Sequence, residues 1–309
     1  MMKINNNSGV ALVITLLVLA LLITVILDFN LGMRVEAKAA ANFRDDTKAY
    51  YLARSGITFA IELLEEDKKT ASQYDSLNEL WAQKVPPIPV GDGFVQVEIH
   101  DEDGKININR LATGFGTVSG DNMRAYMTRF LEQFELKEEI TDSITDWIDA
   151  DDIERIGGAE SSYYESLEES YEGKNNLLHS LQELRLIKGI DDDILTTIHG
   201  FLTIHSDGKI NVNTASKEAL ISLSEELTGD IADEIIAFRL ENPFQQVVDV
   251  KNNISISDHV YTEISKFIDI KSNYFSISST GEINQSRRTI IAIIERSGTK
   301  SKIKYWRVE

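Results

Sequence analysis

Residues 10–27, VALVITLLVLALLITVIL, form an unbroken apolar run directly after the polar leader MMKINNNSG. A span of roughly 20 apolar residues crosses a bilayer core as a helix, and this run lies at the lower end of that range. A secretory signal peptide would have a shorter apolar region followed by a small-residue cleavage site. Lys3 precedes the run, whereas Arg34, Lys38 and Arg44 follow it, so charge bias alone orients the span poorly. We therefore expect an amino-terminal transmembrane helix.

The leader ends in Gly9, and the apolar helix after it runs straight into an amphipathic one. This arrangement resembles the type IV pilin and pseudopilin class, in which a membrane peptidase cuts after the glycine. The resemblance implies processing between Gly9 and Val10, with methylation of the new amino terminus. Most members have a Glu at the fifth mature position that neutralises the amino terminus of the neighbouring subunit, but this chain has Ile14.

An unpaired carboxylate is costly in a bilayer or a fibre core, so losing that Glu fits a subunit with no neighbour above it. Among the pseudopilins, this departure is characteristic of the minor pseudopilin K family of type II secretion systems. The order of elements described below resembles that family over essentially the whole chain. A plain amino-terminal anchor on an unrelated domain is the alternative interpretation of the segment.

The composition is strongly acidic, with 50 Asp and Glu residues against 31 Lys and Arg and a formal net charge of −19. This balance repels nucleic acid and anionic lipid headgroups, and it favours cations or basic partners. The chain has no cysteine, which excludes thiolate chemistry, disulfides and zinc sites with Cys ligands. Its 309 residues suggest about two domains.

Apolar residues recur at three- and four-residue spacing from Tyr50 to Leu64, which predicts an amphipathic helix to about Asp67. Gly32 is the expected place for a kink. The proline-rich stretch 86–89 excludes both helix and central strand, so we expect a loop there. Alternating apolar residues then predict four strands, one from Gly93 and three in the segments YFSISSTGEI, RRTIIAIIER and KIKYWRVE.

These elements predict an α+β fold, in which a pilin-like long amino-terminal helix packs on a small antiparallel sheet. A large all-α insertion separates the first strand from the other three. The expected segments are a leader at 1–9, the transmembrane and amphipathic helix at 10–67, a sheet domain formed by 68–103 and 269–309, and the inserted domain at 104–268, in two parts of about 104–206 and 207–268.

The insertion contains a short internal repeat, because DGKININ at 103–109 recurs as DGKINVN at 207–213. Two similar turn-to-helix entries and a true duplication both explain it. The second part resembles SAM-like and helix-hairpin-helix domains, whose DNA-binding members expose backbone N–H groups to a phosphate at a glycine-flanked hairpin. Here that position reads SEELTGDIA, which is acidic and has the single Gly229. The resemblance therefore implies the fold and not the DNA contact.

Carboxylates are concentrated in one stretch of the insertion, where Asp149, Asp151 and Asp152 fall within four residues and Glu160 follows two glycines. Such carboxylates repel one another unless a cation neutralises them, and Ca²⁺ takes six to eight oxygen ligands in a flexible shell. The spacing does not match an EF-hand loop. The alternative is a solvated loop whose acids cap neighbouring helices.

In the protein K family, the matching stretch has D-W-I-D-x-D and G-A-E elements and a later Asn before S-x-x-E-L-R. The family associates this stretch with bound calcium. Carried over residue by residue, the resemblance implies a structural Ca²⁺ held by Asp149, Asp151, Glu160 and Asn175, with Asp152 as a reserve ligand.

The sequence contains no G-x-S-x-G, H-E-x-x-H or G-x-x-x-x-G-K-[ST] motif. The resemblance implies a non-enzymatic minor pseudopilin that caps the tip of the pseudopilus and helps start its assembly. It implies a single-pass protein of the bacterial inner membrane, with its carboxyl-terminal domain in the periplasm. The implied partners are the I- and J-type minor pseudopilins, the major pseudopilin and the prepilin peptidase, with no nucleic acid.

Two alternatives come from other functional classes. A membrane-anchored helix-hairpin-helix protein that captures DNA at the cell envelope is disfavoured by the net charge and by the acidic hairpin. An anchored calcium-dependent hydrolase lacks a recognisable nucleophile or base.

Overall fold

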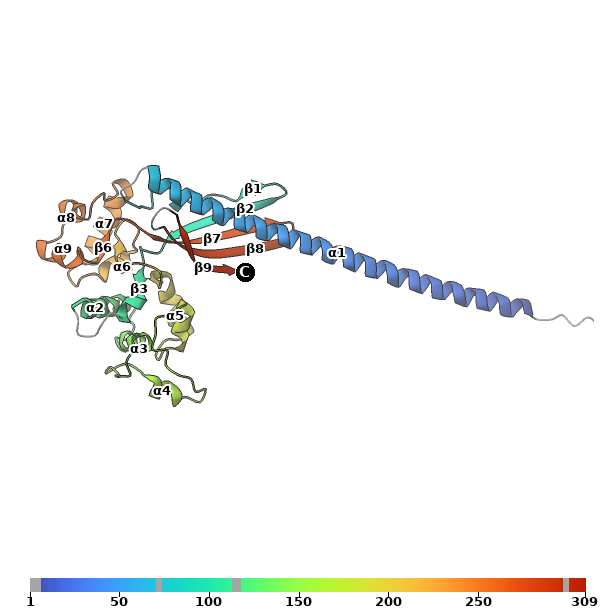
Figure 1. Ribbon diagram of the computed structural model, residues 1–309, viewed down its shortest axis with the longest axis horizontal. Helices are drawn as coiled ribbons and strands as arrows, with labels where there is room; N and C mark the ends of the chain where they lie inside the picture. The colour runs from blue at the N-terminus through green and yellow to red at the C-terminus, as the bar shows by residue number, and fades with distance from the viewer. Residues whose placement is uncertain (1–6, 71–73, 113–117, 297–299) are drawn as a thin grey trace, which may run out of the picture.

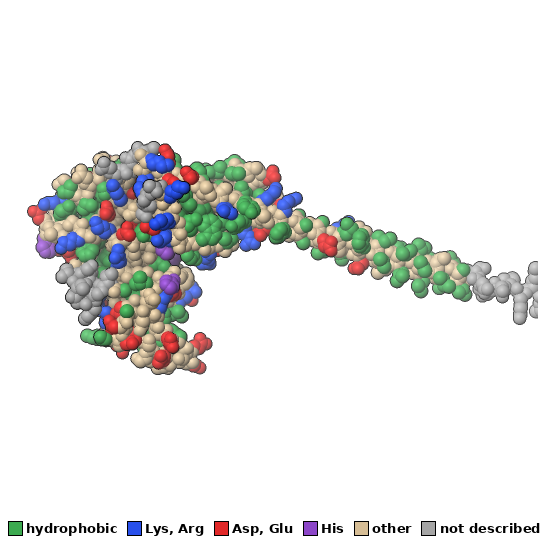
Figure 2. Space-filling view, in the orientation of Figure 1, with side chains coloured by type: hydrophobic (Ala, Val, Ile, Leu, Met, Phe, Trp, Pro, Cys, Tyr) green, Lys and Arg blue, Asp and Glu red, His purple; other side chains and the backbone are tan. Residues whose placement is uncertain are grey.

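A computed structural model describes residues 7–70, 74–112, 118–296 and 300–309. Helix α1, Asn7–Thr70, is continuous and projects far from a globular head (Figure 1). Its apolar side chains from Val10 to Val35 are exposed, and the helix is long and apolar enough to span a membrane (Figure 2). This matches the expected amino-terminal span.

The expected kink at Gly32 is wrong, because the helix runs through this residue and Figure 1 shows no sharp bend. One glycine weakens a helix by only about 1 kcal/mol relative to Ala. Nearby Asn30 also supports the helix, since its side-chain amide donates to the Ile26 carbonyl at 2.9 Å. The helix ends at Thr70, slightly beyond the predicted Asp67.

The sheet is antiparallel and has five strands in the order β1-β2-β7-β8-β9. The prediction of four strands missed β1, Ile88–Val90, which contains Pro89. Proline has no N–H to donate, and β1 lies at the edge of the sheet, where a strand tolerates it. The other strands are β2 (Gly93–Asp101), β7 (Tyr274–Ile283), β8 (Ser286–Glu295) and β9 (Lys302–Val308).

Helix α1 lies across β2, β7 and β8, and small residues bring it close to the sheet. A Cβ atom added at Gly56 would lie 2.1 Å from the Ser279 hydroxyl, and one at Gly281 would lie 2.1 Å from the Ala49 carbonyl oxygen. Larger side chains at these two glycines would push the helix and the sheet apart. The core between them is apolar and buried, and it includes Ala53, Ile57, Leu64, Trp81, Phe275, Ile277, Ile290 and Ile294.

The chain between β2 and β7 forms a mainly helical lobe with its own hydrophobic core, which extends from Ile106 to Ile270. The two separate cores support the division of the chain near 104 and 268, which we keep as a proposal. The α-helices of the lobe are α2 (Val118–Glu132), α3 (Glu139–Ile148), α4 (Ser161–Glu165), α5 (Asp192–Ile198), α6 (Lys217–Ile221), α7 (Gly229–Glu241), α8 (Val248–Asn253) and α9 (Asp258–Ile264). Short 3₁₀ helices are η1 (Leu80–Ala82), which precedes the sheet, and, within the lobe, η2 (Ile108–Ala112), η3 (Leu181–Leu186) and η4 (His199–Phe201).

Two short parallel strand pairs also lie in the lobe, which was expected to be entirely helical. Strand β3, Ile106–Asn107, pairs with β4, Leu202–Thr203, and β5, Ile210–Asn211, pairs with β6, Ile268–Asp269. Each pair encloses one stretch of helices. We call residues 106–203 the first module and residues 210–269 the second module.

The asparagines in the two copies of the short internal repeat form corresponding hydrogen bonds. Asn107 accepts from the N–H of residue 109, and Asn211 accepts from the N–H of residue 213. The side chain of Asn109 both donates to and accepts from the backbone of Leu178, while Asn213 does the same with Phe244. This agreement in hydrogen bonding favours a true duplication over two similar turns. The resemblance of the second module to helix-hairpin-helix domains stays a prediction.

Candidate metal centre

The carboxylates singled out in the sequence meet where α3 ends and α4 begins. Asp149 follows α3 and donates its N–H to the Thr145 carbonyl at 2.9 Å, which closes the last turn of that helix. Glu160 immediately precedes α4 in an extended conformation. The loop between them returns the chain, so that carboxylate oxygens of Asp149, Asp151 and Glu160 lie within 4.8 Å of one another.

Several oxygen atoms in this cluster are buried without a hydrogen-bond donor among the described residues. They are Oδ1 of Asp149, both carboxylate oxygens of Glu160 and Oδ1 of Asn175. Buried polar atoms without partners are rare because each costs free energy. Hard oxygen atoms that converge in this way are the ligand set that Ca²⁺ prefers. The residues present therefore fit a divalent cation.

Electrostatic repulsion within the cluster agrees with this interpretation. Burial, followed by the nearby charges of Asp146 and Asp149, raises the pKa of Glu160 to about 7. Burial also raises the pKa of Asp149. The protein thus holds carboxylates in a place where, without a cation, they resist ionisation.

Asp152 and Asn175 are connected to each other. The Asn175 amide donates to the Asp152 carboxylate at 2.8 Å, and Asn175 has a positive φ of 45°. Asn tolerates this left-handed conformation better than most residues. Asp152 thus fixes the Asn175 side chain, whose oxygen remains buried and without a donor among the residues placed in the structure. This position suits Asp152 to a supporting role.

Sequence reasoning missed two residues that fix the geometry. Arg155 lies between the carboxylates of Asp146 and Asp149, with its Nη1 atom 2.5 and 2.6 Å from their oxygens. Asp146 is completely buried and also accepts from the Arg155 N–H at 3.1 Å. Gly158 makes this arrangement possible, since a Cβ atom there would lie 1.8 Å from Asp146 Oδ2. An Asp one helical turn before Asp149, on the buried face of α3, was the available signal.

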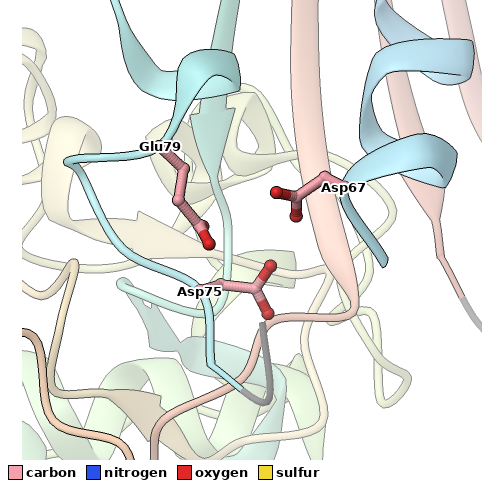
Figure 3. A group of neighbouring side chains, drawn as sticks. All are labelled: Asp67, Asp75 and Glu79. Carbon is pink, nitrogen blue, oxygen red and sulfur yellow. The ribbon is translucent and has the colours of Figure 1, made fainter. Parts of the chain in front are cut away.

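A second carboxylate group, which the sequence analysis did not anticipate, lies at the junction of the lobe and the sheet domain. Figure 3 shows Asp67, Asp75 and Glu79 pointing toward one another, with oxygens within 4.8 Å. Burial and the charge of Glu79 raise the pKa of Asp67 to about 6. Arg296 forms ion pairs with both Asp67 and Asp75.

Protein groups already use the oxygens of this second cluster. Glu79 accepts from the Ser76 N–H and the Trp81 indole at 2.9 and 2.8 Å, and Asp75 also accepts from the Ser272 N–H. The buried guanidinium of Arg296 supplies the positive charge here. We therefore interpret the group as an ion-pair junction and place the candidate metal site at Asp149, Asp151 and Glu160.

The residues of the expected cleavage site lie in the first turns of α1. A Cβ atom at Gly9 would meet nothing within 4 Å among the atoms described. Packing inside the chain therefore does not explain why this residue is glycine. The side chains of Val10 and Ile14 are exposed on the same helix.

Comparisons with known proteins agree with this architecture. Two family models of type II secretion system protein K match residues 104–207 and 210–271, which together make up more than half of the chain. The chain belongs to the type II secretion system protein K family. It is thus a minor pseudopilin of type II secretion, as the sequence resemblance implied. The two matched ranges also correspond closely to the two modules.

Relatives match over nearly the whole length. A type II secretion system protein K from Pseudomonas aeruginosa is 27% identical, over 97% of this chain and 91% of its own length. The one from Aeromonas hydrophila is 23% identical, over 94% and 93%. A chain in the crystal structure of the GspK-GspI-GspJ complex from enterotoxigenic Escherichia coli has a TM-score of 0.73 at 17% identity, with 89% of this chain and 99% of that chain covered. That last likeness shows the fold.

Proposed function

We propose that this minor pseudopilin caps the tip of the periplasmic pseudopilus and helps to start its assembly. The observation that carries the proposal is the position of the lobe. The lobe is attached to the sheet domain at the end of α1 that is far from the apolar span (Figure 1). It extends well to one side of the helix axis (Figure 1). A lobe of domain size at this position would collide with the next subunit if it repeated along a thin fibre. Only the end of the fibre has room for it.

Ile14 supports the same position independently. At the fifth residue after Gly9, most pseudopilins have a Glu that neutralises the amino terminus of the neighbouring subunit. A tip subunit has no such neighbour, and a carboxylate there would lie unpaired among apolar helices. Ile14 avoids that cost.

The partners follow from this location. The structural neighbour forms a complex with GspI and GspJ. By analogy, α1 and the head of this chain assemble with I- and J-type minor pseudopilins, and the complex sits on the major pseudopilin. The prepilin peptidase removes residues 1–9 and exposes Val10, which is then methylated. The span anchors the chain in the inner membrane before assembly, with the head in the periplasm.

The metal centre is proposed to hold a structural Ca²⁺. Asp149, Asp151, Glu160 and Asn175 are its ligands, and Asp152 and Arg155 hold Asn175 and Asp149 in place. The bound ion would neutralise the cluster and fix the loop between α3 and α4. This role is structural, and we propose no catalytic activity for the protein. DNA capture is not favoured, because a net charge of −19 repels a polyanion.

Site-specific labelling tests the capping role. The chain has no cysteine, so Glu169→Cys on the exposed surface after α4 provides a unique attachment point. Gold labelling of purified pseudopili should place one particle at one end of each fibre. The cysteine-free chain is the matched control and should give no label. Particles distributed along the shaft would refute the capping role.

A further inference from the structure

A cleft of about 970 Å³ opens beside the metal centre, between α2, the start of α3 and the loop that carries Asp151. The loop contributes Ile153 and Ile156 to its wall. Ile153 is 74% exposed and Ile156 is fully exposed. Within the described ranges and outside α1, no large apolar side chain is more exposed than these two. Two neighbouring isoleucines in this state mark a surface that gains stability when a partner covers it.

The charges around the cleft indicate what kind of partner fits. Five carboxylates line it, against the guanidinium groups of Arg124 and Arg155. Both arginines are already engaged, since Arg124 pairs with Asp142 at 2.7 Å and with Glu138 at 3.3 Å, while Arg155 pairs with Asp146 and Asp149. Glu139 and Glu154 line the cleft as well and add negative charge. The rim is therefore acidic around an apolar centre, and an acidic partner would be repelled.

We propose that this cleft is a docking site for a basic, apolar segment of a partner protein. Apolar side chains of that segment pack against Ile153 and Ile156. Lysine or arginine side chains beside them contact Glu139 and Glu154. Buried apolar contacts supply the affinity, and the acidic rim supplies the selection for basic segments.

The loop that carries Ile153 and Ile156, residues 149–160, is held by the same carboxylates that form the metal centre. The Ile153 N–H donates to Asp151 at 3.0 Å, and the Arg155 side chain bonds Asp149 at 2.6 Å. The loop then ends at Glu160, another candidate ligand. A cation that neutralises Asp149, Asp151 and Glu160 would fix both ends of the loop and thus the positions of the two isoleucines. The effect of the cation on the two isoleucines rests on the proposed calcium site, whereas the proposal of a docking surface depends only on the cleft.

Peptide binding to the full-length protein in phosphatidylcholine nanodiscs tests the proposal. The probe is a fluorescein-labelled 12-residue amphipathic peptide with leucines on one face and lysines on the other, read by fluorescence polarisation with Ca²⁺ present. A twin peptide with glutamates in place of the lysines is the charge control. We expect the basic peptide to bind and the acidic twin to bind at least tenfold more weakly. Equal affinity for the two peptides would overturn the proposal.

Variants locate the binding site. Ile153→Ser combined with Ile156→Ser should weaken binding of the basic peptide at least tenfold, and Glu154→Lys should weaken it severalfold. Leu240→Ser, at an exposed leucine on α7, is the matched control and should bind as the parent does. Because all these side chains are exposed, the melting temperature should stay unchanged. Unaltered peptide affinity in the double isoleucine variant would refute the docking site.

A calcium arm separates this proposal from the calcium site. Isothermal titration with Ca²⁺ alone measures ion binding, and peptide affinity is then repeated in chelator, where we expect it to fall at least threefold. If Ca²⁺ does not bind but the peptide still depends on Ile153 and Ile156, the calcium site fails and the docking surface stands. If Ca²⁺ binds but the isoleucines do not matter, the docking surface fails and the calcium site stands.

Discussion

The two modules of the lobe share a frame, which consists of two short paired strands and the hydrogen bonds of two asparagines. They differ in the segments that lie between the paired strands. Both begin with an Ile-Asn strand, both close with a short parallel partner strand, and both use an asparagine to hold a distant backbone segment. A serine also lies three residues after each closing strand and accepts from the first asparagine, although the accepting atom is the backbone carbonyl of Ser206 for Asn107 and the hydroxyl of Ser272 for Asn211. The frame is thus defined by a few buried amide contacts.

The enclosed segments differ in how their polar atoms are satisfied. In the second module, helices α6 to α9 follow one another closely, and Asn213 is fully engaged with Phe244. In the first module, the stretch between α3 and η3 contains only the short α4, and it holds buried oxygens of Asp149, Glu160 and Asn175 without donors among the residues described. The repeated frame therefore secures the fold, and the longer connection of the first module carries the candidate site.

The largest expected effect concerns the frame. Asn213→Ala would leave the N–H and carbonyl of Phe244 buried without their partner, which should lower the free energy of unfolding by about 2–4 kcal/mol. Asn109→Ala removes the equivalent contacts with Leu178 and should cost less, because Asn109 is only half-buried. Urea denaturation of both variants measures the difference. Asn253→Ala, at an exposed asparagine, is the control. If this variant lowers the free energy of unfolding as much as Asn213→Ala does, the contacts of Asn213 with Phe244 do not stabilise the second module.

Calcium should act on the first module alone. At a concentration one hundred times the dissociation constant, an ion that binds only the folded state stabilises it by about 2.7 kcal/mol. Asp149→Ala with Glu160→Ala should abolish this gain, which differential scanning calorimetry measures with Ca²⁺ and with chelator. The control pair Glu225→Ala and Glu241→Ala removes two exposed acids of the second module and should keep the gain. If Ca²⁺ does not change the melting temperature of the parent protein, the proposed calcium site is wrong.

A smaller effect should come from Asp152, which holds the Asn175 amide at 2.8 Å. Substitution of residues that orient metal ligands typically lowers affinity 10–100-fold. Asp152→Ala should therefore weaken Ca²⁺ binding about tenfold, without the complete loss expected from Glu160→Ala. Isothermal titration distinguishes the two. A loss as complete as that of Glu160→Ala would instead make Asp152 a direct ligand.

The smallest expected effect is a pH dependence of the metal-free protein. The pKa of Glu160 is raised to about 7 in the folded state, so between its ordinary value and pH 7 the folded chain binds more protons than the unfolded chain. In chelator, stability should therefore increase as the pH falls from above 7 toward 5. Glu160→Gln, which cannot ionise, should remove this part of the pH dependence. Thermal melts of both proteins across that range, compared in chelator, check the prediction.

Much of the architecture could be predicted from the sequence, because its signals are local. The apolar run from Val10 reports the span directly, and the alternating residues of β2, β7 and β8 report a half-buried sheet. Asp149, Asp151 and Glu160 were nominated by short spacing together with the family resemblance, and the structure brings these three together. Whether they bind calcium stays a prediction.

The missed features depend on how the folded chain places side chains, which sequence spacing alone does not show. Arg155 has no ligand character, and only the folded loop brings it between Asp146 and Asp149. Arg296 lies 229 and 221 residues from Asp67 and Asp75 along the chain, and only the fold brings it to them. Local propensity also misled at Pro89, which an edge strand tolerates, and at Gly32, where the continuous helix outweighs the weak preference of one residue.

The unbroken course of α1 has a mechanical consequence. A helix of 64 residues is roughly 96 Å long at 1.5 Å per residue. Its far end is fixed to the head by the close approaches at Gly56 and Gly281 and by Arg288, whose guanidinium contacts both carboxylate oxygens of Asp46 at 2.6 and 2.8 Å. Helix and sheet therefore form one rigid unit. A displacement of the membrane end along the helix axis should move the sheet with it, and with the sheet the two points at which the chain enters and leaves the lobe.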